Sequence, residues 1–208
     1  MGLSEFSGGA VMRLCMRIFL RMSTIAVLCA CVSVCAAENF GEDRFDAVIV
    51  SVANSYHVDP LLIKAMIWHE SRFNPVAEGG AGEVGLMQIK TAVAHDWAKS
   101  KGVKQPVAEE LFDPYLNIEI GTWYFARALN KWKSSSHALL LALGEYNAGP
   151  TKVLRWIRRS HGNTERAIAR SASALYVRKI RDKYMEYSLQ YADSVVFAGE
   201  LSPRIARR

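Results

Sequence analysis

The sequence predicts an all-α protein with a single compact domain, and three observations lead to this fold class. Beyond residue 40, apolar residues recur at intervals of three and four, the spacing of a helix face that packs on a core. Asp-Pro pairs at 59–60 and 113–114 are typical helix starts, because Asp caps the first turn and Pro needs no N–H there. No stretch shows the apolar-polar alternation of a half-buried strand. The chain has 208 residues, half of them apolar, which is enough to bury one core.

Six helices follow from these patterns. The second is bounded at both ends, since Asp59-Pro60 starts it and Asn74-Pro75 stops it near Ser71. A glycine-rich loop over residues 78–85 separates it from the third helix, and Pro150 starts the fifth. The expected helices are 45–56, 59–71, 86–97, 113–132, 150–159 and one from about 171 to 191, with a short buried segment at 138–143.

Residues 1–37 are expected to be an export signal. Arg13, Arg17 and Arg21 precede an uncharged run, 22–37, that ends in the small residues a signal peptidase reads. The run is short for a membrane-spanning helix, which needs about 20 apolar residues. The sequence therefore predicts an exported protein.

All four cysteines lie within the first 35 residues, which excludes a disulfide-linked core and a cysteine-based zinc site in the domain. Leu28-Cys29-Ala30-Cys31 also approximates a lipoprotein signal, in which Cys31 would carry a lipid anchor and associate the protein with a membrane. The cleaved-signal and lipoprotein alternatives both stay open. In either case the expected domain is 38–197, followed by a basic tail over 198–208.

Charge is distributed unevenly along the chain. Residues 38–150 carry a net charge of −4, whereas residues 151–208 carry +8. The basic part suggests an anionic partner, such as a cell-wall polymer or a membrane surface, or else a solvated helix face. No basic run is interleaved with aromatic residues, so nucleic acid is not expected as a partner.

Two patterns in the sequence are misleading. Residues 80–85 spell G-x-G-x-x-G, but the dinucleotide fingerprint requires a preceding strand within a βαβ unit, and a helix is expected there instead. His69-Glu70 could begin a zinc-protease helix, but that motif needs a histidine where Phe73 stands. Neither a cofactor nor a metal is therefore expected.

Glu70 is the candidate catalytic acid. It ends an apolar helix and is flanked in the sequence by Trp68 and Phe73, so we expect a partly buried carboxyl with a raised pKa. The negative end of the helix dipole acts in the same direction. A carboxyl that holds its proton near neutral pH can serve as a general acid.

Three segments give the sequence a family resemblance: Glu70-Ser71, then Gly85-Leu86-Met87-Gln88, then Tyr146-Asn147-Ala148-Gly149. In this order and at these intervals, they resemble bacterial lytic transglycosylases of the soluble, goose-lysozyme-like type. The resemblance covers residues 43–190 and includes further matches at 74–75, 111–114, 117–118 and 176–177. It implies a lysozyme-like fold, a mainly helical member of the α+β class, with a groove for a peptidoglycan glycan strand. Together with the export signal, it also implies a location in the bacterial periplasm or cell envelope.

The resemblance also implies a chemistry. Glu70 would protonate the oxygen that joins N-acetylmuramic acid to N-acetylglucosamine, and would then take the proton of the C6 hydroxyl as that oxygen closes onto C1. The product is a 1,6-anhydromuramoyl end, formed without water or a second catalytic carboxylate. The residues implied in substrate binding are Ser71, Met87, Gln88, Tyr146, Asn147 and Tyr176. Among these, Ser71 would position the substrate or the Glu70 carboxyl, and Met87 would either line the groove or pack in the core.

The sequence departs from the family pattern at three places. Lys90-Thr91 stands where a proline is common, Gly79-Gly80 where many members have a serine, and residues 171–173 where Glu-Thr is usual. These departures affect details of the groove. Glu145 adds a possible further carboxylate, expected at the groove wall or a helix end.

Two other functions stay open. A goose-type muramidase would hydrolyse the same bond, but hydrolysis needs a second carboxylate. In the loop before the Gly-Leu-Met-Gln segment only Glu78 and Glu83 are available, and Lys90 follows the segment. A non-catalytic glycan-binding protein would not require the Glu70-Ser71 pair. Wall turnover, cell division and assembly of a secretion machinery are all compatible settings.

Overall fold

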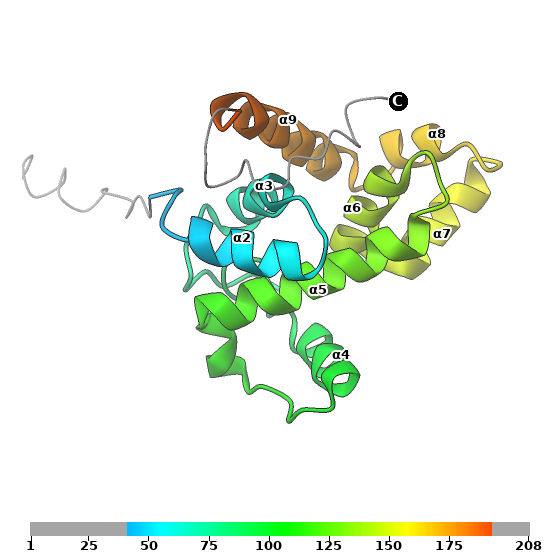
Figure 1. Cartoon of the computed structure of the whole chain (residues 1–208). Coiled ribbons are helices and arrows are strands. Elements are labelled where there is room, and N and C mark those ends of the chain that lie inside the picture. The colour runs from blue at the N-terminus through cyan, green and yellow to red at the C-terminus, as the bar shows by residue number, and fades with distance from the viewer. Residues whose placement is uncertain (1–40, 193–208) are drawn as a thin grey trace, which may run out of the picture. The chain divides into compact units, whose positions relative to one another are not determined.

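The computed structural model describes residues 41–192, and this part of the chain is built almost entirely of helices (Figure 1). Its only bridged extended residues are in the loop after α3, where Val84 pairs with Glu78 and Ile89. The elements are α2 (Asp46–Ser55), α3 (Pro60–Ser71), α4 (Thr91–Lys101), the 3₁₀ helix η1 (Ala108–Phe112), α5 (Pro114–Trp132), α6 (Ala138–Ala148), α7 (Pro150–Arg159), α8 (Thr164–Ala169) and α9 (Ala174–Gln190).

The two Asp-Pro starts form as the sequence predicts. The Asp59 carboxylate accepts a hydrogen bond from the Leu61 N–H at 2.9 Å, and Asp113 accepts one from the Leu116 N–H at 2.8 Å. Each satisfies a helix N–H that has no partner within the helix. Because these signals are local, the starts of α3 and α5 are confirmed to the residue.

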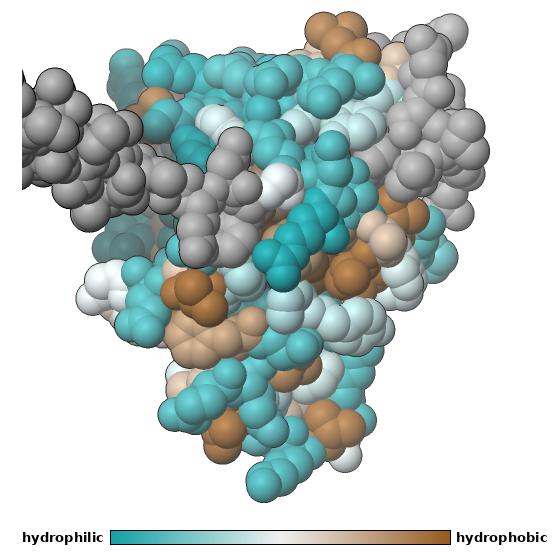
Figure 2. All heavy atoms as spheres, turned by 90° about the vertical axis from the view of Figure 1, so that its left-hand side faces the viewer, coloured by the Kyte–Doolittle hydropathy of each residue, from teal (hydrophilic) through white to brown (hydrophobic). Residues whose placement is uncertain are grey.

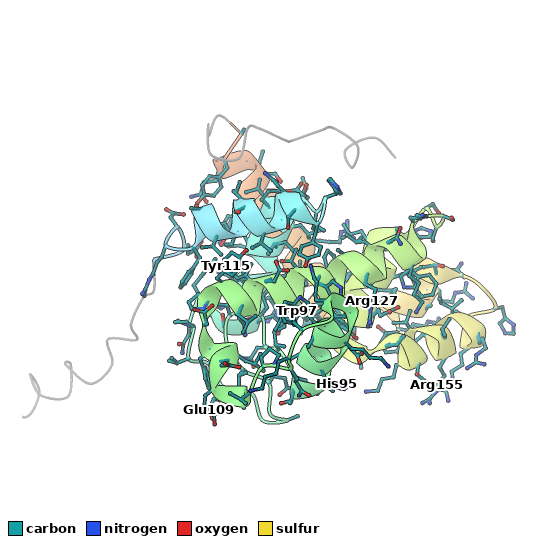
Figure 3. All side chains as sticks on the ribbon, turned by 60° about the horizontal axis from the view of Figure 1, so that its bottom comes forward. His95, Trp97, Glu109, Tyr115, Arg127 and Arg155 are labelled. Atoms are coloured by element: carbon teal, nitrogen blue, oxygen red, sulfur yellow. The ribbon has the colours of Figure 1, made fainter. Side chains whose placement is uncertain are left out.

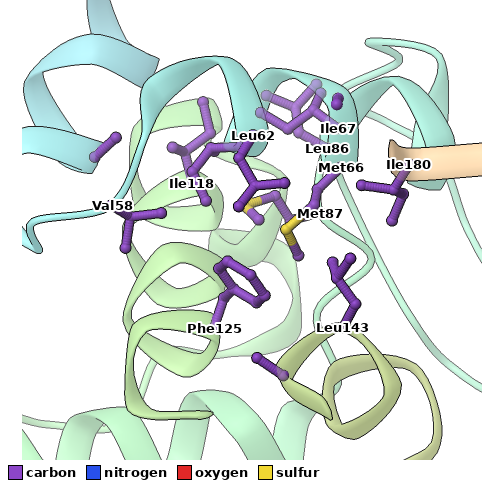
Figure 4. Packing of buried hydrophobic residues seen from close by; sticks show 14 of the residues in the cluster. Val58, Leu62, Met66, Ile67, Leu86, Met87, Ile118, Phe125, Leu143 and Ile180 are labelled. Carbon is purple, nitrogen blue, oxygen red and sulfur yellow. The ribbon is translucent and has the colours of Figure 1, made fainter. Parts of the chain in front are cut away.

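The core lies around α3, which is buried on every side between α2 and α9. The long helix α5 crosses the domain and packs on α2, α4 and α6. Figure 4 shows the region where Met66 of α3 and Phe125 of α5 meet the side chain of Met87. A helix that is apolar all round must be enclosed, so the position of its last turn is fixed by packing. By contrast, the face in Figure 2 is mainly polar, with its apolar side chains in small patches.

The helix expected at 86–97 begins later, at Thr91. Residues 86–89 form a tight turn instead, closed by two hydrogen bonds between the backbones of Val84 and Ile89, with Gln88 at a φ of 51°. Leu86, Met87 and Ile89 are buried because the turn itself enters the core. A short apolar run has the same pattern whether it forms a buried helix or a buried turn.

Other boundaries differ less. The buried segment expected at 138–143 is the first half of α6, which continues to Ala148. The short helix α8 is absent from the expectation, and α9 begins at Ala174 rather than near 171. No helix within 41–192 is long and apolar enough to cross a membrane. The expected signal at 1–37, with Cys31, and the tail at 198–208 lie outside the described residues.

Candidate active site

Glu70 sits in the last turn of α3, where the chain reverses sharply. Arg72 and Phe73 both adopt the left-handed conformation, with φ of 54° and 61°. Two consecutive non-glycine residues in this region are unusual, and such backbone strain is concentrated at functional sites. Phe73 is anchored in the core, so the reversal is held by packing. Glu70, two residues before this reversal, is half-buried.

The carboxyl of Glu70 is held by Tyr176 of α9. The Tyr176 hydroxyl donates a hydrogen bond of 2.7 Å to Glu70 Oε1 across 106 positions of sequence. Tyr176 is itself buried, and the ring of His69 packs edge-on against it, with centroids 4.7 Å apart. The sequence prediction placed Tyr176 at the substrate, whereas the structure makes it the direct partner of the candidate acid.

Burial raises the pKa of Glu70 from its ordinary 4.5 to about 7. The hydrogen bond from Tyr176 opposes this rise because it favours the charged form, and the negative charge of Glu83 adds to it. Desolvation is the largest of the three effects. The direction agrees with the sequence expectation, and a pKa near neutrality lets the group donate and accept a proton at the same pH.

A cleft of about 470 Å³ opens at Glu70. It is bounded by the end of α3, the 83–90 segment, and parts of α4, α5, α6 and α7. Tyr124 and Tyr146 form an aromatic pair on one side, with ring centroids 5.6 Å apart. The lining residues are Glu70, Glu83, Gln88, Ile89, Lys90, Val93, Tyr124, Tyr146, Asn147, Ala148, Gly149 and Lys152.

Three predicted site residues line this cleft and are locked in place by hydrogen bonds. The Gln88 amide donates to the carbonyls of Ala77 and Gly85 at 3.3 and 3.1 Å. The Tyr146 hydroxyl donates to the Met87 carbonyl at 2.9 Å, and Asn147 Oδ1 accepts from the Ser173 hydroxyl at 2.6 Å. The Gln88 side-chain oxygen makes no described hydrogen bond within residues 41–192 and can accept one from a ligand.

Ser71 and Met87 do not line the cleft. The Ser71 hydroxyl donates to the Leu86 carbonyl at 2.9 Å. It therefore connects the end of α3 to the 86–89 turn and does not reach the carboxyl of Glu70. The Met87 side chain is fully buried against Gly121 and is not part of the cleft, because the turn points it into the core. Only its carbonyl serves the site, through Tyr146.

The side chain of Asn117, in α5, makes three hydrogen bonds to the backbone in and around the 86–89 turn. Its side-chain oxygen accepts from the Met87 N–H at 2.7 Å, and its amide donates to the carbonyls of Val84 and Leu111 at 2.9 and 2.7 Å. Gly85 has a φ of 77°, and a Cβ there would collide with the Asn117 amide. Sequence reasoning noted residue 117 only as a supporting match. A buried polar residue in a helix is a signal that something beside the helix needs hydrogen bonds.

Two further carboxylates, those of Glu145 and Glu83, already have partners within the protein. Glu145, expected at the groove wall or a helix end, is buried outside the cleft, where its Oε2 accepts from Lys131 Nζ and Trp132 Nε1, both at 2.8 Å. Glu83 does line the cleft, but its Oε1 pairs with Lys90 at 3.0 Å, and its Oε2 accepts from the Ala81 N–H at 2.9 Å. These partners, Lys90 first, lower the pKa of Glu83 and keep it ionised.

A family model described as the Transglycosylase SLT domain matches residues 47–169, which is more than half of the chain. The chain belongs to this family. The matched range contains all the residues that line the cleft, Glu70 among them, but it ends before Tyr176.

Curated relatives of this SLT domain include two bacterial enzymes. It is 39% identical over 93 residues to the membrane-bound lytic murein transglycosylase E of Buchnera aphidicola, a match that covers 44% of this chain and 42% of the relative. It is 36% identical over 121 residues to the membrane-bound lytic murein transglycosylase C of Sodalis glossinidius, covering 54% and 33%. The chain thus spans less than half the length of these relatives.

Solved structures share the fold of the SLT domain. The lytic transglycosylase Slt of Pseudomonas aeruginosa superposes with a TM-score of 0.64 at 23% identity, over 72% of this chain and 25% of that one. The 70 kDa soluble lytic transglycosylase of Escherichia coli gives 0.63 at the same identity, over 71% and 24%. These similarities confirm the lysozyme-like helical fold that the sequence predicts.

Replacing Tyr176 with Phe should change how kcat/KM of the SLT domain depends on pH. Because the hydroxyl stabilises the ionised form of Glu70, its loss should raise the pKa of Glu70 further and move the alkaline limb of kcat/KM to higher pH. We also expect about a tenfold lower kcat from the looser carboxyl. The matched control is Tyr187→Phe, which removes a hydroxyl that α9 directs to Glu42. An alkaline limb that stays in place, or moves down, would contradict the assigned contact.

Proposed function

We propose that this chain is a peptidoglycan lytic transglycosylase of the bacterial cell envelope, with Glu70 as both acid and base. The observation that supports this most strongly is the Glu70 carboxyl itself, which lines a cleft, is fixed by Tyr176, and has a pKa of about 7. The names of the curated relatives, lytic murein transglycosylases, agree with it.

The reaction begins with protonated Glu70. Its proton passes to the glycosidic oxygen, the C1–O bond breaks, and N-acetylglucosamine leaves as the alcohol. The acetamido oxygen of N-acetylmuramic acid stabilises C1, as in other substrate-assisted glycosidases. Glu70, now ionised, removes the proton from the C6 hydroxyl, and O6 bonds to C1. The cycle returns Glu70 to its protonated form and leaves a 1,6-anhydromuramoyl end.

The surrounding residues would orient the glycan for these steps. Gln88 offers an open oxygen to the N–H of an acetamido group, and the Tyr124–Tyr146 pair offers aromatic faces to the sugar rings. Asn147 would contact the strand at the side of the cleft formed by α6. Ser71 and Met87 would act indirectly, by fixing the 86–89 turn that carries Gln88.

Mass spectrometry of digested murein sacculi tests the proposal. We expect new 1,6-anhydromuramic ends, each one water lighter than the corresponding reducing end. New reducing ends alone would identify a hydrolytic muramidase. Binding to sacculi without any new ends would identify a glycan-binding protein.

Glu83 decides between the transglycosylase and the muramidase alternative. It is the second carboxylate of the cleft, but both of its oxygens already have partners, so it is poorly placed to activate water. In Glu83→Gln, which still offers an oxygen to the Ala81 N–H, we expect activity within about tenfold of wild type and an unchanged anhydro product. A hydrolase that used Glu83 as its base would lose about 10³-fold.

Export and anchoring form a separate part of the proposal. The relatives named above are membrane-bound by name, which agrees with an envelope location. We infer that residues 1–37 direct export, with Cys31 as the point of lipid attachment if the segment is a lipoprotein signal. Labelling with radioactive palmitate that disappears in Cys31→Ser would support the anchor, whereas an unlabelled mature protein starting near residue 38 would support a cleaved signal.

A further inference from the structure

Helix α7 carries a stripe of three basic side chains. Lys152, Arg155 and Arg159 are spaced three and four residues apart, which places them on one face of the helix. All three are exposed, and Arg155 is visible on α7 in Figure 3. At 1.5 Å per residue, the stripe extends about 10 Å along the helix. We refer to these three residues as the α7 stripe.

No ion pair described within residues 41–192 involves the α7 stripe. From residue 150 to residue 170 the sequence has six Lys and Arg residues and a single carboxylate, Glu165, which is exposed. Like charges three and four positions apart on a helix repel one another and lower its stability. A row of this kind therefore favours an anionic ligand, which would relieve the repulsion.

The α7 stripe begins inside the cleft. Lys152 lines it together with Glu70, whereas Arg155 and Arg159 lie further along α7. The cleft has one other lysine, Lys90, whose charge is already paired with Glu83. Lys152 therefore offers a positive charge to whatever occupies the cleft, and the other two cations extend that charge outward.

We propose that the α7 stripe binds the carboxylates of the peptide side chain that each N-acetylmuramic acid of the glycan carries. This rests on the proposed function, since it assumes that a peptidoglycan strand occupies the cleft. Ammonium and guanidinium groups form their strongest hydrogen bonds with carboxylates. A 10 Å row of cations corresponds to about three residues of extended peptide, at roughly 3.3 Å each.

The distribution of apolar side chains favours this ligand over an anionic membrane. Surface-bound helices pair basic residues with apolar side chains that enter the lipid. The exposed apolar residue of α7 is Leu154, which is 44% exposed. One exposed apolar side chain leaves α7 with little apolar surface to enter a lipid layer.

The test compares two substrates and two variants of the full mature chain. The substrates are glycan strands with intact peptides and the same strands after an amidase has removed the peptides. The stripe variant is Lys152→Gln/Arg155→Gln/Arg159→Gln. The matched control, Arg158→Gln/Arg166→Gln/Arg170→Gln, removes three exposed cations of α7 and its neighbourhood that are outside the stripe. The readout is the ratio of kcat/KM on peptide-bearing strands to kcat/KM on stripped strands.

We expect the stripe variant to lower this ratio at least fivefold, mainly through KM, and the control to leave it unchanged. The wild-type ratio should also fall as KCl is raised, because salt screens exposed charges. An unchanged ratio in the stripe variant would overturn the proposal. The proposal would also be overturned if the stripe variant lost binding to phosphatidylglycerol vesicles while its ratio of kcat/KM values stayed the same. That result would show that the α7 stripe binds a membrane. Wild-type protein that forms no anhydro ends on either substrate would instead refute the proposed function.

Discussion

Replacing Glu70 with Gln should reduce the release of anhydro products from sacculi by about 10³-fold or more. Gln has nearly the same size and can still accept the hydrogen bond from Tyr176, but it has no acidic proton to give to the glycosidic oxygen. Binding to sacculi should persist, because the rest of the cleft is unchanged. Activity within tenfold of wild type would show that another group is the acid.

The stability of the same variant provides its control. Burial holds the pKa of Glu70 at about 7 in the folded protein, against 4.5 ordinarily, so the proton is bound more tightly in the folded state. The stability this provides is complete below about pH 4.5 and is lost as the pH rises through 7. Glu70→Gln has no such loss and should be more stable than wild type at pH 8 by about 3 kcal/mol, with little difference at pH 4. Thermal unfolding at the two pH values checks this and excludes misfolding as the cause of inactivity.

Replacing Asn117 with Ala should destabilise the domain by about 3 to 5 kcal/mol. It leaves the Met87 N–H and the Leu111 carbonyl buried without their partner, and each unmet group costs roughly 1 to 3 kcal/mol. The Val84 carbonyl loses one of its two hydrogen bonds and keeps the one from the Ile89 N–H. Urea unfolding monitored by circular dichroism measures the loss. Asn130→Ala is the matched control, since Asn130 is exposed on the same helix. Equal losses in the two variants would contradict the role assigned to Asn117.

The same substitution should also reduce activity. Asn117 does not line the cleft, but it supports the turn that carries Gln88 and presents the Met87 carbonyl to Tyr146. We expect kcat to fall about tenfold even at temperatures where the variant is fully folded, because small displacements of positioning groups slow catalysis. A folded variant with normal kcat would show that the turn does not need this support.

The helix starts could be predicted from the sequence because their causes are local. Asp59-Pro60 and Asp113-Pro114 contain both the capping group and the residue that tolerates a missing N–H. The 86–89 turn could not be predicted in the same way. Its conformation depends on Asn117, some 30 positions later, and on Ser71, some 15 positions earlier. A short window of sequence contains neither partner, so its apolar residues looked like a helix.

In the candidate site, too, features with a local cause could be predicted from the sequence, whereas features that depend on distant residues could not. The raised pKa of Glu70 could be anticipated from an acidic residue at the end of an apolar helix. The residue that fixes its carboxyl, Tyr176, is 106 positions away, and only the family resemblance pointed to it. Likewise, the engagement of Glu83 by Lys90 depends on how the loop folds back. Which carboxylate is available to the substrate is thus a property of the tertiary structure.

Titration of the Glu70 carboxyl tests the central claim most directly. The full mature protein, labelled with ¹³C at glutamate side-chain carboxyls, would be followed by NMR from pH 4 to 9, with Glu70→Gln identifying the signal. We predict an apparent pKa of about 7, which leaves the group able to donate and then accept a proton under the same conditions. An apparent pKa near 4.5 would mean that Glu70 is ionised at neutral pH, and would contradict its role as the acid.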